Sequence, residues 1–253
     1  MMVEKVGQDK NHFLKGGALY STSRPTYPEA LADVLMASCV ERGHALDVGC
    51  GSGQLSVLLG DRFQKVTATD PSQTQLDSAV SHATVTYKME PAEQISLPNN
   101  SVDLISAAQA AHWFDLDLFY NEVRRIARPN AVIALVTYGV PTMKGDIGRL
   151  FEKFYWQDIH SFWPDGRQHV ENGYKNLAFP FVEREMPELS ISRQWSLNQL
   201  IAYIYTWSAM RRARDAGNGR IIDEFIREAR RCWPDEESRK SVVWPVMGRL
   251  GAL

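Results

Sequence analysis

Short apolar runs alternate with helix-like stretches between about residue 44 and residue 138. The helix-like stretches are 53–62, a segment from Pro71 to about Ser81, and 115–128. Strands that alternate with helices imply right-handed crossover connections and a doubly wound, mostly parallel sheet of the α/β class. The runs that predict strands are 44–49, 65–70, 84–89, 101–109 and 130–138.

The stretch at 115–128 carries a clear helical pattern. Its apolar residues recur at helical spacing, Asp115 is the predicted N-cap, and Pro129 is predicted to close the helix. We therefore expect one apolar face, formed by Leu116, Phe119, Tyr120, Val123 and Ile126.

The alternation stops after Gly139. Residues 143–163 predict helix and are rich in aromatic side chains, and a polar stretch follows at 165–176. Ser196 is the predicted cap of a helix that runs to Ala216, and a shorter helix covers about 219–232. Large aromatics dominate burial in folded proteins, so most of these side chains are expected to be core.

Two further segments complete the expected sheet. Residues 181–194 look extended, and the closing SVVWPVMGRL reads as a strand. Together with the five earlier runs, they predict a seven-stranded sheet with a helical, aromatic-rich cap inserted near its end.

Composition excludes several classes of protein. The chain has 253 residues and a formal charge of -2, so no global field favours nucleic acid or anionic lipid. The first residues are polar and contain no signal-peptide pattern, and the longest apolar run, 131–136, is too short to cross a bilayer. Three cysteines without CxxC spacing indicate neither a disulfide framework nor a zinc site, and no metal is expected. A reducing cytoplasm is the expected location.

A glycine-rich turn lies between the first strand and the first helix. It reads Asp47-Val-Gly49-Cys-Gly51-Ser-Gly53, and the second strand ends at Asp70. Ligands of open α/β sheets bind beyond the carboxyl ends of the strands, where this turn lies, and a carboxylate such as Asp70 can accept both hydroxyls of a ribose.

Two ligands compete for this turn: a nicotinamide dinucleotide and S-adenosylmethionine. Dinucleotide sites use G-x-G-x-x-G, whereas this turn is G-x-G-x-G with an acid two residues before it. That acid would repel a pyrophosphate but suits a sulfonium and an α-ammonium group. The pattern therefore favours S-adenosylmethionine.

The sequence resembles the class I methyltransferases, whose first motif is D/E-x-G-x-G-x-G, and within them the type 11 group and its trans-aconitate methyltransferase-like proteins. This likeness implies a Rossmann-like fold, S-adenosylmethionine as cofactor and methylation of a small molecule, which could be O-methylation of a carboxylate. The stretches that carry it are 13–31, 45–56, 66–72, 90–115 and 205–217, with RPTYP and AAQAAHWFD the more specific segments.

The resemblance also implies a division of the chain and a cofactor site. Residues 1–32 would form an arm over the cofactor, 33–140 the cofactor-binding core, 141–180 the cap insertion, and 181–253 the end of the core sheet with substrate-side helices. The implied cofactor contacts are Asp47, Gly49, Gly51 and Gly53 at the methionine end, Asp70 at the ribose, Pro71, Ser72, Ala92 and Glu93 around the adenine, and Gln109 and Ala110 near the sulfonium. Pro91 departs from the group, many of whose members have Asp there.

The arm and the segment after the fourth strand supply further candidates. Tyr20 and Arg24 would share one face if the arm is helical, and Arg24 could bind the carboxylate of the cofactor or that of a substrate. His112 could be a base for a hydroxyl or amine acceptor, or only a packed hydrogen-bonding group. Other candidate substrate contacts are Tyr27, Trp113, Trp207 and Arg211, although core packing is the favoured interpretation for Trp207.

Three alternative functions stay open. The first is a protein that binds S-adenosylmethionine without turnover, the second is methylation of nucleic-acid bases, and the third is a nicotinamide-dependent dehydrogenase. The second lacks support, because the N/D-P-P-Y/F signature of base-amine enzymes is replaced by Ala110-Ala111-His112-Trp113. The expected partner is a small-molecule methyl acceptor, with no nucleic acid and no membrane. The oligomeric state cannot be predicted.

Overall fold

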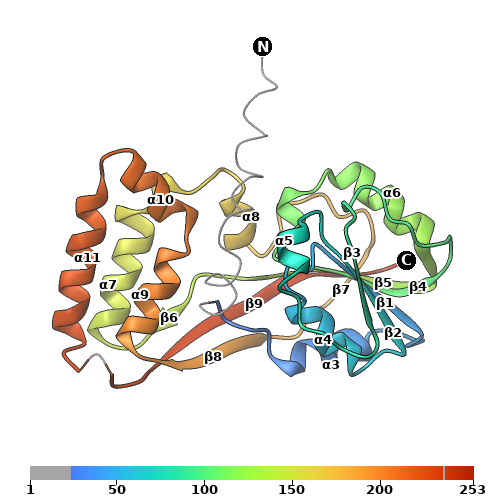
Figure 1. The fold of residues 1–253 in the computed structure, drawn as a ribbon, viewed down its shortest axis with the longest axis horizontal. Coiled ribbons are helices and arrows are strands. Elements are labelled where there is room, and N and C mark those ends of the chain that lie inside the picture. The colour runs from blue at the N-terminus through green and yellow to red at the C-terminus, as the bar shows by residue number, and fades with distance from the viewer. Residues whose placement is uncertain (1–23, 236) are drawn as a thin grey trace, which may run out of the picture.

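The computed structural model describes residues 24–235 and 237–253. The molecule has an α/β lobe and a helical lobe, and the strand β9, Lys240–Ala252, runs from one to the other (Figure 1). Within the described residues, no helix combines the length and the hydropathy needed to cross a bilayer.

One mixed sheet forms the centre of the molecule. Seven strands follow the order β3-β2-β1-β4-β5-β9-β6, with β1 to β5 parallel and β9 antiparallel to β5. Two more, β7 and β8, pair with β9 alone. The doubly wound sheet predicted from the sequence is confirmed. The strands are β1 His44–Val48, β2 Lys65–Thr69, β3 Val85–Lys88, β4 Val102–Ala108, β5 Ala127–Tyr138, β6 Thr142–Met143, β7 Val182–Arg184, β8 Leu189–Trp195 and β9 Lys240–Ala252.

Helices cover both faces of the parallel strands. Side chains alternate along a strand, so Ala45 packs in the same cluster as α3 and α4, whereas Leu46 packs in the same cluster as α6. Figure 1 shows α3 and α4 on one side of the sheet and α6 on the other. These helices are α3 Glu29–Ala37, α4 Gln54–Gly60, α5 Gln73–Leu76 and α6 Leu116–Ile126.

The α/β lobe corrects two helix predictions and confirms a third. Asp115 caps α6, accepting the Leu118 N–H at 3.2 Å, as predicted. The prediction that Pro129 closes this helix was wrong: β5 begins at Ala127, and Pro129 lies where the β4–β5 register shifts and its missing N–H costs least. The helix expected from Pro71 to Ser81 is a single turn capped by Ser72.

The helical lobe is built from two separate stretches of the chain, 146–171 and 197–232. A capping box of Ser196 and Gln199 starts α9, as Ser196 predicted. The single helix expected to Ala216 was wrong, because Trp207 is extended and turns its ring into an aromatic cluster with Phe151 and Tyr155. The polar stretch at 165–176 also contains a helix. The elements are α7 Asp146–Lys153, the turns η3 Phe154–Asp158 and η4 His160–Phe162, α8 Arg167–Glu171, α9 Leu197–Tyr205, α10 Ser208–Asp215 and α11 Gly219–Cys232.

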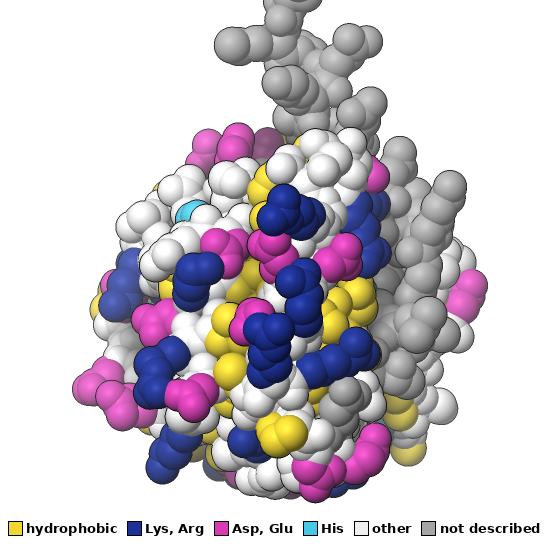
Figure 2. Space-filling model, turned by 90° about the vertical axis from the view of Figure 1, so that its left-hand side faces the viewer, with side chains coloured by type: hydrophobic (Ala, Val, Ile, Leu, Met, Phe, Trp, Pro, Cys, Tyr) yellow, Lys and Arg dark blue, Asp and Glu magenta, His cyan; other side chains and the backbone are white. Residues whose placement is uncertain are grey.

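A single long strand joins the two lobes. Residues 246–252 of β9 pair with β5 in the α/β lobe, and residues 240–246 pair with β8, which leads into α9. The end of the molecule formed by the helical lobe carries Lys and Arg interspersed with Asp and Glu (Figure 2). That face therefore presents no continuous basic surface.

Candidate functional site

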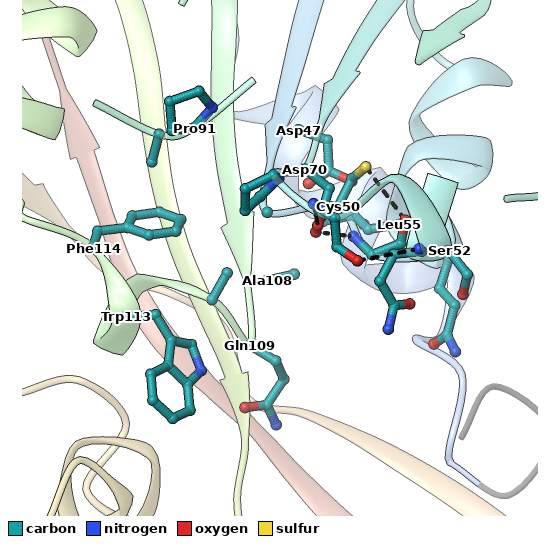
Figure 3. Close-up of a pocket in the computed structure, with 18 of the residues that line it drawn as sticks. Asp47, Cys50, Ser52, Leu55, Asp70, Pro91, Ala108, Gln109, Trp113 and Phe114 are labelled. Atoms are coloured by element: carbon teal, nitrogen blue, oxygen red, sulfur yellow. Dashed lines mark hydrogen bonds between the residues drawn. The ribbon is translucent and has the colours of Figure 1, made fainter. Parts of the chain in front are cut away.

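A cavity of about 450 Å³ lies at the carboxyl ends of β1, β2 and β4. Figure 3 shows Asp47, Asp70 and the glycine turn on one side of it, and Pro91, Phe114 and Trp113 on the other. The cavity thus has an acidic side and an apolar, aromatic side. This position, beyond the ends of parallel strands, is where open α/β sheets bind ligands.

The glycine turn after β1 requires glycine at two of its positions. Gly49 and Gly53 have φ values of 66° and 80°, which side chains rarely adopt. A Cβ at Gly49 would lie 2.5 Å from the Ala110 Cβ, and one at Gly53 would lie 2.1 Å from the Tyr87 hydroxyl. The bare turn therefore lets main-chain atoms form the cavity wall.

Asp47 is the penultimate residue of the buried strand β1 and is 1% exposed, yet it lines the cavity. Its carboxylate accepts hydrogen bonds from the hydroxyls of Ser56 at 2.6 Å and Ser106 at 3.0 Å. Its pKa is raised to about 6, mainly by burial and also by the charge of nearby Asp70, while the hydrogen bonds from the two hydroxyls oppose the increase. The electrostatic cost of this buried charge would be offset by a cation in the cavity.

Asp70 follows β2 and faces the same cavity. Its two oxygens accept the backbone N–H groups of Gly51 at 2.9 Å and Ser72 at 2.8 Å. Burial raises the pKa of Asp70, and the two backbone hydrogen bonds oppose the increase. Asp70 therefore ties the glycine turn to the start of α5 while its remaining lone pairs stay available to a ligand.

The remaining predicted cofactor residues within the described part of the chain also line this cavity, apart from Gly53. Pro71, Ser72, Ala92 and Glu93 line it, and Glu93 accepts the Asp115 N–H at 2.9 Å. Gly49, Gly51, Gln109 and Ala110 line it as well, whereas Gly53 shapes the turn behind it. Tyr20 lies outside the described residues.

Gln109 comes directly after β4 and has a φ of 58°, a strained conformation for a residue other than glycine. Its side chain donates to the Tyr138 carbonyl at 3.1 Å and accepts from the Thr137 hydroxyl at 2.9 Å. Its N–H donates to the Val136 carbonyl at 2.8 Å. These three bonds to β5 hold Gln109 in the cavity wall.

A second, smaller cavity of about 90 Å³ adjoins the first. Arg24, Gln109, Trp113 and Tyr138 line both, so ligands in the two cavities would meet at this shared wall. The rest of the smaller cavity comes mainly from the helical lobe. It is formed by His112, Trp163, Pro164, Gly166, Arg167, Val170, Tyr203, Trp207 and Ser208.

His112 lies in the short turn η2, Ala111–Trp113, and lines the smaller cavity. Its Nδ1 is 3.0 Å from the hydroxyl of the fully buried Tyr174. Burial, together with the charges of Arg167, His169 and Arg24, lowers its pKa to about 3. The imidazole is therefore neutral at physiological pH, which makes it a weak proton acceptor.

The predicted substrate contacts are distributed unevenly. Trp113 lines both cavities, Trp207 the smaller one and Tyr27 the larger one. Trp207 is only 4% exposed, so it belongs to the packed core, as predicted, and also forms part of the cavity wall. Arg211 is exposed and lines neither cavity, because α10 turns Ala209, Met210 and Ala213 to the core instead.

Sequence reasoning missed several cavity residues. Tyr138 ends β5, so the rule that ligands lie at strand ends could have identified it. Phe114 belongs to the AAQAAHWFD segment but was not singled out. Gln75 and Cys50 carry no comparable signal. Arg167 lies in a stretch interpreted as a polar connection, and its position depends on α8 packing near His112, which no local pattern predicts.

Comparison with known proteins gives consistent matches. A family model described as a methyltransferase domain, Methyltransf_11, matches residues 46–135. A protein of Dictyostelium discoideum, named as a methyltransferase, is 36% identical over 210 residues, covering 81% of this chain and 80% of its own length. A malonyl-[acyl-carrier protein] O-methyltransferase of Serratia marcescens is 31% identical over 127 residues, covering 49% of this chain and 46% of its own length.

A solved structure is also similar over most of the chain. It is described as a type II methyltransferase from Anaeromyxobacter dehalogenans, and it superposes with a TM-score of 0.84 at 43% identity. The match covers 90% of this chain and 97% of that one. The similarity therefore includes the helical lobe as well as the α/β lobe.

Proposed function

Because the chain belongs to the class I S-adenosylmethionine-dependent methyltransferases, with a type 11 methyltransferase domain, we propose that it methylates a carboxylate oxygen of a small molecule. The sequence resembles trans-aconitate methyltransferase-like proteins, so trans-aconitate is one of the carboxylates that we propose as acceptors. A relative whose name places the transferred methyl on oxygen supports it.

The larger cavity suits the cofactor of this family. Its acidic side holds two carboxylates, Asp47 and Asp70, and a positively charged ligand would compensate both. Asp70 would accept the ribose hydroxyls, Asp47 and the glycine turn would face the methionine end, and Pro71 and Ala92 would flank the adenine. Bound there, the cofactor supplies an activated methyl group on a positively charged sulfur.

One observation carries the choice of acceptor: the two adjoining cavities have opposite charge. The larger one is lined by three acidic side chains, Asp47, Asp70 and Glu93, and one arginine. The described wall of the smaller one contains two arginines, Arg24 and Arg167, and no acidic side chain. A cationic donor and an anionic acceptor would therefore bind side by side, whereas an ammonium acceptor would be repelled.

A carboxylate acceptor also agrees with the state of His112. An ionised carboxylate attacks a methyl group without losing a proton, so the enzyme needs to align the two ligands and exclude water. A neutral imidazole whose pKa is held at about 3 would be a poor base for a hydroxyl or an amine. We assign His112 to the wall of the acceptor cavity, and the helical lobe to the cap over the acceptor.

The proposal is tested by the chemical stability of the product. Purified protein is incubated with methyl-labelled S-adenosylmethionine and a panel of small mono-, di- and tricarboxylic acids, trans-aconitate included, with the matching amides as controls. We expect label in products that release volatile methanol in mild base, because methyl esters hydrolyse there. Label found only in base-stable products would identify N-methylation or ether formation instead.

His112 gives a separate prediction on pH dependence. With a carboxylate acceptor and saturating cofactor, kcat should stay flat between pH 6 and 9, since His112 is neutral throughout. His112→Gln should keep the flat profile and lose less than ~100-fold in kcat, the lower end of what a general base contributes. If kcat of the wild type instead changes with pH near neutrality, and this change is absent in His112→Gln, then His112 acts as a base.

A further inference from the structure

Arg167 begins α8 and reaches the acceptor cavity from the helical lobe, on the part of its wall that the cofactor cavity does not share. Its guanidinium is enclosed by protein, with 18% of the side chain exposed. A buried arginine is costly unless its charge and its five N–H groups find partners. The contacts of Arg167 show which of these groups are already used.

One edge of the guanidinium is held by protein. Its Nε donates to the Tyr155 hydroxyl at 2.7 Å and lies 3.4 Å from a Glu171 oxygen. The same hydroxyl donates to that Glu171 oxygen at 2.5 Å, and His160 contacts the other oxygen at 3.3 Å. Tyr155 is fully buried, so its contacts with Glu171 and Arg167 fix the position of Nε of the guanidinium.

The plane of the guanidinium is fixed as well. Its central carbon lies 4.4 Å from the centre of the Trp163 ring and 5.6 Å from that of Tyr155. Stacking on aromatic rings removes rotational freedom that a lysine would keep. The side chain is therefore set in position before any ligand arrives.

The other edge of the guanidinium has no protein acceptor. Within the described part of the chain, the side-chain hydrogen bonds of Arg167 involve Nε alone, so its two terminal nitrogens have no acceptor there, and the residue lines the smaller cavity. The indole N–H of Trp163, beneath the guanidinium, is buried and has no acceptor among the described residues. The wall of the smaller cavity therefore carries N–H donors that have no hydrogen-bond acceptor among the described residues.

From this arrangement, and resting on the proposed function, we infer that Arg167 selects methyl acceptors by binding an anionic group with its two free nitrogens, and that Tyr155 and Glu171 position it. A planar carboxylate matches the two parallel N–H groups of an arginine edge. A neutral ester or amide of the same shape offers no charged acceptor to the two terminal nitrogens of Arg167, and sites built for such bonds reject analogues that lack them. Arg167 is then the specificity-determining residue of the cavity.

The test measures binding and does not require turnover. Wild-type protein saturated with S-adenosylhomocysteine is titrated calorimetrically with acetate, succinate and trans-aconitate, and then with their methyl esters. We expect at least one acid to bind and its ester to bind at least ~10-fold more weakly, since the ester cannot accept the charge-assisted hydrogen bonds that a carboxylate accepts. If no acid binds, or if acid and ester bind alike, the inference is wrong.

Three variants separate recognition from folding. Arg167→Gln should weaken binding of the acid at least ~10-fold, and Arg167→Lys should recover part of the loss because the charge remains. Tyr155→Phe, which removes only the positioning hydroxyl, should weaken acid binding several-fold. All three should bind S-adenosylhomocysteine like wild type. Arg220→Gln is the matched control, because Arg220 also pairs with a glutamate at i+4 but is 87% exposed on α11.

The same variants distinguish this inference from the function it rests on. If an acid binds through Arg167 but yields no methyl ester, the proposed reaction fails and the anion site stands. If esters form with unchanged KM in Arg167→Gln and Tyr155→Phe, carboxylate methylation stands and Arg167 has no part in selecting the acceptor.

Discussion

Asp70→Ala is expected to weaken S-adenosylmethionine binding by at least ~2 kcal/mol, which is roughly 30-fold. The variant loses the proposed charged acceptor of the ribose hydroxyls. It also loses two hydrogen bonds that hold the cavity together, because the Asp70 carboxylate accepts the N–H groups of Gly51 and Ser72. The ligand contact and the support of the glycine turn disappear together, so the effect should exceed that of an ordinary hydrogen bond.

Titration calorimetry of the variant against wild type measures this change. Asp77→Ala is a suitable control, since Asp77 lies nearby at the end of α5 but is exposed and bonds Gln73. Thermal melting of each protein shows whether the fold is intact. Wild-type affinity in a folded Asp70→Ala protein would remove Asp70 from the cofactor site.

Asp47→Asn is expected to weaken cofactor binding and, at neutral pH, to stabilise the ligand-free protein. The pKa of Asp47 rises from 3.8 to about 6 on folding, so the folded protein holds this proton more tightly than the unfolded chain does. Stability contributed by this group therefore falls as pH rises from about 4 to about 6, and above that range the buried charge is a net cost. Each pKa unit corresponds to about 1.4 kcal/mol, so the variant should gain on the order of 1–3 kcal/mol.

Two measurements check this prediction. Urea unfolding between pH 5 and pH 8 should show the advantage of the variant growing towards pH 6 and then levelling. Cofactor affinity of wild type should fall below about pH 6 as Asp47 becomes protonated, whereas the weaker affinity of Asp47→Asn should lack that step. Equal affinities for the two proteins at pH 7.5 would show that Asp47 does not serve the cofactor.

The sequence predicts what local patterns determine. Strand periodicity predicted the parallel core, and Ser196 and Asp115 predicted helix starts, since a capping side chain bonds an N–H only three residues away. The glycine turn and the acid after β2 were likewise recognisable, because both are set by chain geometry at strand ends. The prediction that Pro129 closes a helix was wrong, because whether a proline ends a helix or lies at an irregularity in a strand depends on the partner strand.

Features that depend on distant parts of the chain were not predictable in this way. Trp207 breaks a helix because its ring packs against Phe151 and Tyr155, which lie about 50 residues earlier in the sequence. The sequence made Arg211 a candidate substrate contact because it belongs to a recognisable segment, 205–217, whereas no sequence pattern singled out Arg167. Which arginine lines the smaller cavity depends on how α8 and α10 pack against the rest of the molecule, and no local sequence pattern determines that packing.

The course of β9 also bears on how this scaffold could acquire a new acceptor. Both stretches of the helical lobe lie between β5 and β9 in the sequence, and the register of β9 with β5 is fixed residue by residue. At Gly248 even one added methyl group would lie 2.2 Å from the Leu135 carbonyl oxygen. A helical lobe exchanged as a unit would have to rejoin β9 in that same register, so a new acceptor preference is more accessible through side-chain replacement inside the existing lobe.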